Sequence, residues 1–366
     1  MNESLTRPPP PRHPEIARAA SAGFVTIAPI PLTTPFRHLP VTLHSSLAFR
    51  PRQLAVWCGL WLAAGLFTGA AWAQGGGASS AVAGSAPAES PTLRKIRDTG
   101  LITLGYRTNS PPFSFLDARR VPVGYSLDLC ERVVDAVKRR LALPDLEVRT
   151  VPVGSATRMP LVANGSVDLE CGITTNTAER QKLVAFSVTT FVAGSKLLSR
   201  RSSGIRTVDD LQGRTVVSTL ATTSIQYLHA LNQARDLDMR ILAGQDDVEA
   251  FRMVSTGRAV AYAMDDVLLL SLLSTAPDAA DFVIADEPLT REPYGIPMRR
   301  GDPVFKKLVD DVLTDLYHRG EIMQIYRRWF QSPVGPRGVN LQLPMSESLQ
   351  RVIRHPTDSP DPATYR

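Results

Sequence analysis

The sequence predicts an α/β protein with mainly parallel strands, built from two lobes of similar design. From residue 92 onward, short apolar runs alternate with stretches of helical periodicity, a pattern typical of strands connected by helices. The alternation occurs over residues 101–170 and again over residues 208–285. A chain of 366 residues is also long enough for about two domains.

The first series begins with a strand over residues 101–106. A helix follows over residues 125–141, because its apolar side chains recur on one face, and Pro144 ends it. Strands are expected over 146–153 and 167–170, with a short helix over 155–164 that Gly165 ends. These elements form a first lobe.

The second series has the same design. Strands are expected over 215–219, 239–243, 260–264 and 282–285, and helices over 222–233, 247–256 and 267–274. One long helix is expected over 303–330, with its buried stripe formed by Val304, Leu308, Val312 and Leu316.

Two extended segments, residues 191–196 and 286–294, connect the lobes as a hinge, and Tyr294 is expected to pack in the core. We therefore assign residues 92–190 plus 291–344 to lobe 1 and residues 196–286 to lobe 2. Ligands of α/β proteins bind in clefts at strand ends, so the cleft between the lobes is the expected site. Residues 345–366 are polar and contain proline, and we expect this tail to be partly disordered.

Residues 1–73 are interpreted as an N-terminal extension followed by a signal peptide. Arg50 and Arg52 precede an apolar run over residues 54–70, and Ala71-Trp72-Ala73 has the pattern of a cleavage site. We expect cleavage after Ala73 and a periplasmic mature chain. The alternative is a membrane anchor, although the apolar run is short for one and contains glycines. Residues 74–91 are a linker of small residues.

The charge of the mature chain excludes some partners. The formal net charge is +6, but residues 1–73 hold six arginines and two glutamates, and the remainder has 35 basic and 33 acidic residues. A nearly neutral chain gives no electrostatic reason to expect nucleic acid or a lipid surface as partner.

The cysteines and histidines show no metal-site spacing, so we expect no metal and no cofactor. Cys58 would be lost on export. Cys130 and Cys171 then remain, and they either pair in an oxidising compartment or stay as buried thiols.

Several stretches resemble a known family: LGYRTNSPPFSFLD, VGYSLDL, NGSVDLECGITTNTAERQKLVAFS, STGRAVAYAMDD and FKKLVDDVL. They resemble the glutamate/aspartate-binding proteins of polar amino-acid ABC importers, members of the family-3 extracellular solute-binding proteins, over residues 92–344. The resemblance implies a type II periplasmic-binding-protein fold, with two α/β lobes joined by a two-strand hinge. It also implies ligand-induced closure, no catalysis, an ABC transporter permease as partner, and a monomer.

The resemblance further implies which residues hold the backbone of an amino acid. Arg180 and Thr175 would hold the α-carboxylate, together with the region of Thr219 and Thr222, where a second-lobe helix begins. Asp265 would hold the α-ammonium. Physical chemistry agrees, because a helix N-terminus and an arginine both bind carboxylates, and a buried ammonium needs an anion beside it.

For the ligand side chain, the resemblance implies that Arg107, Ser155 and Arg158 cradle a distal carboxylate. Three arginines around one ligand suit a dicarboxylic acid. The sequence departs from the family at two positions, with Ile173 in place of a serine and Asp247 in place of a histidine. Asp247 would repel a distal carboxylate unless an arginine neutralises it, so glutamine or asparagine remains an alternative ligand.

Two other functions are considered. One is an enzyme of the same fold, a cyclic acid dehydratase, which would need a general acid or base in the cleft. Glu170 and Asp265 are the candidates for that role. The other is a sensory module that binds the same ligand and signals through a different membrane protein.

Overall fold

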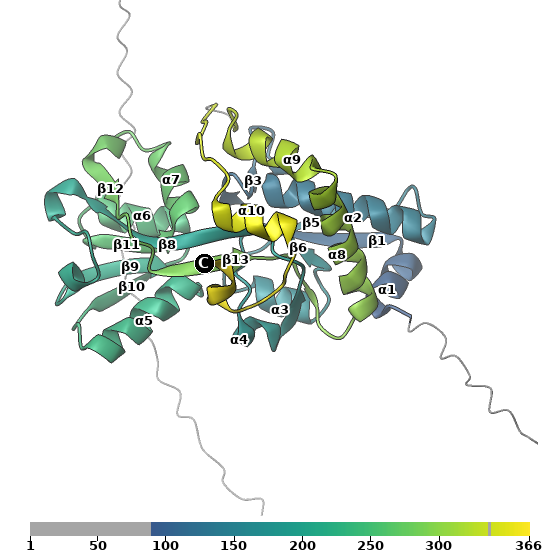
Figure 1. The fold of residues 1–366 in the computed structure, drawn as a ribbon, viewed down its shortest axis with the longest axis horizontal. Coiled ribbons are helices and arrows are strands. Elements are labelled where there is room, and N and C mark those ends of the chain that lie inside the picture. The colour runs from purple at the N-terminus through teal and green to yellow at the C-terminus, as the bar shows by residue number, and fades with distance from the viewer. Residues whose placement is uncertain (1–88, 336–337) are drawn as a thin grey trace, which may run out of the picture. The chain divides into compact units, whose positions relative to one another are not determined.

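The computed structural model describes residues 89–335 and 338–366, which lie in the compact unit Ser80–Arg366 (Figure 1). The expected signal peptide, its cleavage after Ala73 and residues 74–88 of the expected linker lie outside the described residues. Within the described part of the chain, no helix is long and apolar enough to cross a membrane.

The first sheet has the strand order β5-β1-β6-β14-β7. Its strands are β1 (Leu101–Tyr106), β5 (Glu147–Pro152), β6 (Leu169–Glu170), β7 (Val184–Phe186) and β14 (Pro297–Arg299). Strand β1 pairs in parallel with β5 and β6, whereas β14 pairs antiparallel with its neighbours. A small separate sheet contains β2 (Asn109–Ser110), β3 (Ser114–Leu116) and β4 (Pro122–Val123).

Helices cover this first sheet. They are α1 (Pro91–Thr99), α2 (Tyr125–Leu141), α3 (Arg158–Ala163), α4 (Ala178–Gln181), α8 (Pro303–His318) and α9 (Glu321–Phe330). Helix α2 forms as predicted because Leu129, Val133 and Val137 recur every four residues and are all fully buried. Helix α1 begins at Pro91, the last residue of the expected linker, and Ser90 caps it by accepting a hydrogen bond from the Leu93 amide.

The second sheet has the order β10-β9-β11-β8-β12, with β13 also paired to β8. Its strands are β8 (Phe191–Arg200), β9 (Thr215–Thr219), β10 (Arg240–Gly244), β11 (Ala261–Asp265), β12 (Phe282–Ile284) and β13 (Thr290–Tyr294). Its helices are α5 (Thr223–Arg235), α6 (Asp247–Ser255) and α7 (Asp266–Leu273). In Figure 1, α5 lies on one face of this sheet and α6 and α7 lie on the other.

The two sheets are joined by β8 and β13, which pair antiparallel from Phe191–Tyr294 to Ser195–Thr290. The predicted α/β architecture with two lobes and two extended connections is therefore confirmed. The strands are less uniformly parallel than predicted, because β8 and β13 run antiparallel to their partners.

One predicted helix is wrong. Residues 303–330 form two helices instead of one, because Gly320 has a φ of 71°, a left-handed conformation that interrupts helical hydrogen bonding. Of the predicted buried stripe of α8, Leu316 is buried as expected, but the other three buried positions are displaced by one residue. Phe305, Val309 and Leu313 are fully buried, whereas the residue before each of them is only half-buried.

The C-terminal tail is ordered, which corrects the expectation of partial disorder. It forms α10 (Glu347–Arg354) and the short 3-10 helix η4 (Pro362–Tyr365). Tyr365 is 1% exposed, and its hydroxyl lies 2.8 Å from the Thr189 hydroxyl. The tail therefore packs beside the start of β8, as Figure 1 shows for α10.

Cys130 of α2 and Cys171, directly after β6, form a disulfide. The sequence left a disulfide and two buried thiols as alternatives, and the structure has the disulfide. Both residues are fully buried in the first lobe.

Candidate functional site

The expected arginines lie in the loops and short helices that follow first-lobe strands. Arg107 directly follows β1, Arg158 is the first residue of α3, and Arg180 belongs to α4. Arg107 and Arg158 are only 5% and 2% exposed, and Arg180 is half-buried. Ser155 is buried in the loop before α3. The first lobe thus brings the expected cationic residues to one end of its sheet.

These arginines retain hydrogen-bonding capacity. Arg158 donates from Nη1 to the Ile173 carbonyl at 3.2 Å, and Arg180 donates from Nη1 to the Thr175 carbonyl at 2.8 Å. Arg107 Nη1 and Arg158 Nε are buried and have no hydrogen-bond partner among residues 89–335 and 338–366. Buried donors are rarely left unpaired, so the cluster is suited to an anion.

Burial destabilises the charged forms of the clustered arginines. Burial, followed by the neighbouring charges of Arg180 and Arg107, lowers the pKa of Arg158 to about 9. Burial also lowers the pKa of Arg180, an effect that Glu292, Asp265 and Glu170 oppose. An anion placed among these guanidinium groups would stabilise their charged forms.

Asp265 ends β11 in the second lobe and is 3% exposed. Its Oδ2 accepts a hydrogen bond from the Tyr294 hydroxyl, so Tyr294 is more than the core residue expected from the sequence. Its Oδ1 has no partner in the described part of the chain. Burial, followed by the charge of Glu292, raises the pKa of Asp265 well above its ordinary value. Asp265 is therefore an incompletely satisfied buried acid.

Thr219, Thr222 and Asp247 form a connected group where β9 ends and α5 begins. Thr222 caps α5 by accepting a hydrogen bond from the Ile225 amide at 3.3 Å, and its hydroxyl donates to the Thr219 carbonyl at 2.6 Å. Asp247 Oδ1 accepts from the hydroxyls of Thr219 at 2.7 Å and Tyr262 at 3.2 Å. Asp247 is thus held in place by two neutral donors.

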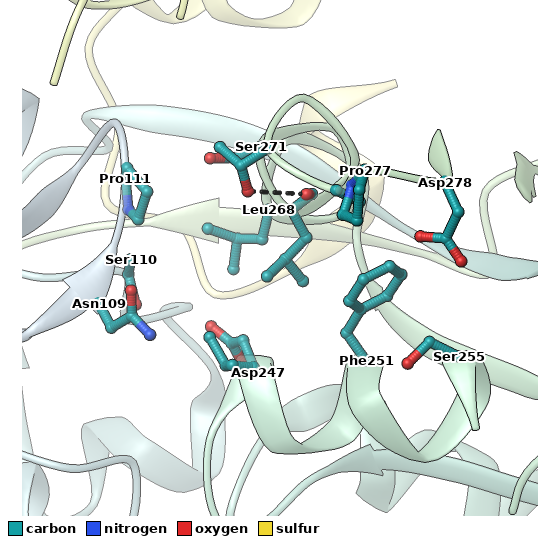
Figure 2. Close-up of a pocket in the computed structure, with 14 residues that line it drawn as sticks. Asn109, Ser110, Pro111, Asp247, Phe251, Ser255, Leu268, Ser271, Pro277 and Asp278 are labelled. Atoms are coloured by element: carbon teal, nitrogen blue, oxygen red, sulfur yellow. Dashed lines mark hydrogen bonds between the residues drawn. The ribbon is translucent and has the colours of Figure 1, made fainter. Parts of the chain in front are cut away.

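Residues of both lobes line two cavities. One, of about 270 Å³, has Arg107, Gly154 and Asp247 in its wall. The other, of about 690 Å³, lies between β2 and helices α6 and α7 (Figure 2). Figure 2 shows Asn109 and Ser110 on one side of it and Phe251 and Leu268 on the other, with Asp247 between them. Asp247 lines both cavities and shares the smaller one with Arg107.

Two further glutamates belong to this region. Glu170 Oε2 accepts from the Thr174 hydroxyl at 2.6 Å, while its buried Oε1 has no hydrogen-bond partner within the described ranges. Glu292 is 2% exposed, and its Oε2 accepts from the Thr223 hydroxyl at 2.7 Å. Sequence reasoning did not assign Glu292 to the site, because it lies within a segment expected only to connect the lobes.

Comparisons with known proteins identify the family of the chain. The model of the bacterial extracellular solute-binding proteins, family 3, matches residues 102–332. An L-glutamate/L-aspartate-binding protein of Pseudomonas aeruginosa is 49% identical over 268 residues, 73% of this chain and 89% of that protein. A glutamate/aspartate import solute-binding protein of Escherichia coli is 40% identical over 274 residues, 75% of this chain and 91% of that protein.

Solved structures show the same fold. A mutant of ArgBP from T. maritima has a TM-score of 0.58 and 27% identity, covering 66% of this chain and 99% of that one. An ancestral amino acid-binding protein, described as a precursor of cyclohexadienyl dehydratase, has a TM-score of 0.56 and 27% identity, covering 65% and 99%. The predicted type II periplasmic-binding-protein fold is thereby confirmed.

Proposed function

The chain belongs to the bacterial extracellular solute-binding proteins of family 3, and we propose that it captures L-glutamate or L-aspartate between its lobes for an ABC importer. One observation carries this proposal. Among the described residues, buried arginines of the first lobe have donors without a partner, and a buried acid at the end of a second-lobe strand has an oxygen without one. The names of the relatives from P. aeruginosa and E. coli support the choice of ligand.

The α-carboxylate of the ligand binds between Arg180, Thr175 and the N-terminus of α5 at Thr222. A helix N-terminus presents unpaired amides, and an arginine can bind a carboxylate through two parallel hydrogen bonds. The α-ammonium binds Asp265, whose Oδ1 lacks a partner in the described structure. One amino acid thus contacts both lobes, so binding favours their closure about β8 and β13.

The distal carboxylate binds Arg107, Arg158 and Ser155. Arg107 Nη1 and Arg158 Nε are donors without a partner in the described ranges, and a single α-carboxylate would leave them unused. A second carboxylate also offsets the cost of burying Arg158, whose pKa is lowered to about 9 by burial and by the nearby arginines. These features favour a dicarboxylic amino acid.

A neutral amide ligand is the second candidate, favoured by the position of Asp247 in the wall of the cavity that Arg107 also lines. An anion there would repel a distal carboxylate and accept a hydrogen bond from an amide. The two hydroxyl groups on Asp247 Oδ1 reduce this repulsion, which is why we place the acidic ligands first.

The proposal extends to the rest of the chain. The mature protein is a periplasmic monomer released by cleavage after Ala73, with residues 92–190 plus 291–344 forming lobe 1 and residues 196–286 forming lobe 2. Its partner is the membrane permease of the importer. As a solute-binding protein it is not an enzyme, so Glu170 and Asp265 have no catalytic role.

Calorimetric titration of residues 74–366, stripped of bound ligand by unfolding and refolding, tests the proposal. The titrants are glutamate, aspartate, glutamine and asparagine. Tight binding of the two acids alone is the expected result. Preference for an amide would mean that Asp247 sets the specificity, and binding of none of the four would contradict the proposed function.

A further inference from the structure

Glu292 is a buried acid that none of the roles above uses. It lies on β13, one of the two strands that connect the lobes, and is 2% exposed. Its Oε2 accepts from the Thr223 hydroxyl at 2.7 Å, and its Oε1 accepts from the Thr290 hydroxyl. Thr223 is the first residue of α5, so Glu292 ties a connecting strand to a helix of the second lobe.

The sheet register places Glu292 on the same face as Asp265. Asp265 pairs with Ser195 of β8, and Ser195 pairs with Thr290 of β13, so these three residues form one row across the sheet. Glu292 lies two residues beyond Thr290 on β13. Because side chains alternate between faces along a strand, Glu292 shares the face of Thr290 and therefore that of Asp265.

Glu292 also acts electrostatically on both residues proposed to hold the amino-acid backbone. After burial, its charge is the largest influence that raises the pKa of Asp265. It is likewise the largest influence that opposes the lowering of the Arg180 pKa by burial. Asp266, Asp247 and Tyr294 are the other groups acting on Asp265.

We propose that Glu292 is a positioning residue that supplies a second negative charge at the ammonium end of the ligand and fixes the start of α5 against β13. It acts through Asp265 and Thr223 and selects ligands that carry an α-ammonium. This inference rests on the proposed function, because it presupposes an amino-acid ligand.

The test compares two ligands in the Glu292→Gln variant: L-glutamate and glutarate, which has both carboxylates but no ammonium. Glutamine can keep hydrogen bonds to Thr223 and Thr290 while removing the charge. We expect L-glutamate affinity to fall about tenfold to a hundredfold, less than for removal of a charge that contacts the ligand directly, because Glu292 acts through Asp265. Glutarate affinity should change by less than about twofold, the usual limit for independent sites, or increase.

Two further variants separate charge from position. Glu287→Gln makes the same change at an exposed residue five positions earlier and should leave both affinities unchanged. Thr223→Val removes the hydrogen bond from α5 but keeps the charge, so it should weaken both ligands together. Thermal unfolding of each variant checks that it folds.

A pH profile gives an independent result. Wild-type affinity for L-glutamate should rise with pH as Asp265 loses its proton, and in Glu292→Gln this rise should move to lower pH. Both proteins contain the same other charged and titratable groups, which are Asp266, Asp247, Tyr294 and Arg180. A shift of the profile between them is therefore caused by the loss of the Glu292 charge. An equal loss for L-glutamate and glutarate, or an unshifted profile, would overturn the inference even when wild type binds glutamate.

Discussion

The two lobes bring opposite charges to the proposed ligand site. The first lobe contributes Arg107, Arg158 and Arg180, which lie in a loop and two short helices after its strands. The second lobe and the connecting strands contribute Asp265, Asp247 and Glu292. Within each set, like charges are buried near one another, and burial opposes ionisation in both.

The opposite charges of the two lobes link ligand binding to lobe closure. A dicarboxylic amino acid carries two negative groups for the first lobe and one positive group for the second. Binding between the lobes therefore offsets the burial cost of both sets together, which neither lobe achieves alone. Variants that change one lobe at a time should therefore separate the two contributions.

The largest effect is expected for Arg180→Ala, which removes the proposed α-carboxylate partner from the first lobe. Affinity for L-glutamate should fall by on the order of 2 to 5 kcal/mol, about 30-fold to several thousand-fold, as for other truncated buried charge pairs. Arg180→Lys should not restore it fully, because lysine lacks the planar fork of guanidinium. Calorimetry measures all three proteins, and an unchanged affinity in Arg180→Ala would remove Arg180 from the site.

In the second lobe, Asp265→Asn should weaken ligand binding but stabilise the ligand-free protein. Loss of the charged hydrogen bond to the ammonium should cost about 1.5 to 3 kcal/mol of binding free energy. The ligand-free protein should become more stable at neutral pH, because asparagine avoids the cost of ionising a buried acid. Chemical denaturation at pH 7 measures the second effect, and a less stable variant would contradict it.

The raised pKa of Asp265 predicts a pH dependence of stability. The folded state holds the proton on Asp265 more tightly than the unfolded state. The stabilisation that this proton gives the folded state is fully present below the ordinary pKa of 3.8 and is lost as pH rises through the pKa of Asp265 in the folded state. Each unit of difference between the folded and unfolded pKa corresponds to about 1.4 kcal/mol of stability. Ligand-free wild type should lose stability over this window relative to Asp265→Asn, and parallel curves would count against the assignment.

The smallest effect is expected for Asp247→Asn. The change removes a charge from the cavity beside Arg107 but keeps the shape of the side chain. The ratio of glutamate to glutamine affinity should rise about twofold to tenfold, a modest change because two hydroxyls already bind Asp247. Asp247→His should also favour acidic ligands. A constant ratio in both variants would exclude Asp247 as a determinant of specificity.

The sequence predicted the elements that have strong local signals. Strand β1 and helix α2 have the expected bounds, because a bounded apolar run and a four-residue repeat of buried side chains specify them locally. The break between α8 and α9 was missed, since a glycine inside an apolar periodic pattern can be tolerated in a helix. The ordered tail was missed because Tyr365 is buried by residues near position 189, far away in the sequence.

For the candidate site, sequence motifs indicated Arg107, Arg158, Arg180 and Asp265, but they carried no information on which polar atoms stay unpaired. The pairing of Cys130 with Cys171 and the contact of Tyr294 with Asp265 are likewise properties of the folded chain. The role of Glu292 could not be predicted from the sequence. Its local sequence indicates only an extended connection, and its burial beside Thr223 follows from the pairing of β13 with β8.

By itself, then, the sequence determined the α/β class and the two lobes, because periodicity is a local property, and its resemblance to a known family indicated the residues available for an amino-acid ligand. The tertiary structure alone decided which charges lie together and which of their hydrogen bonds stay unmade. Burial and electrostatic interaction depend on distances in space between segments remote in sequence, and those distances arise only when the sheets pair and the loops converge.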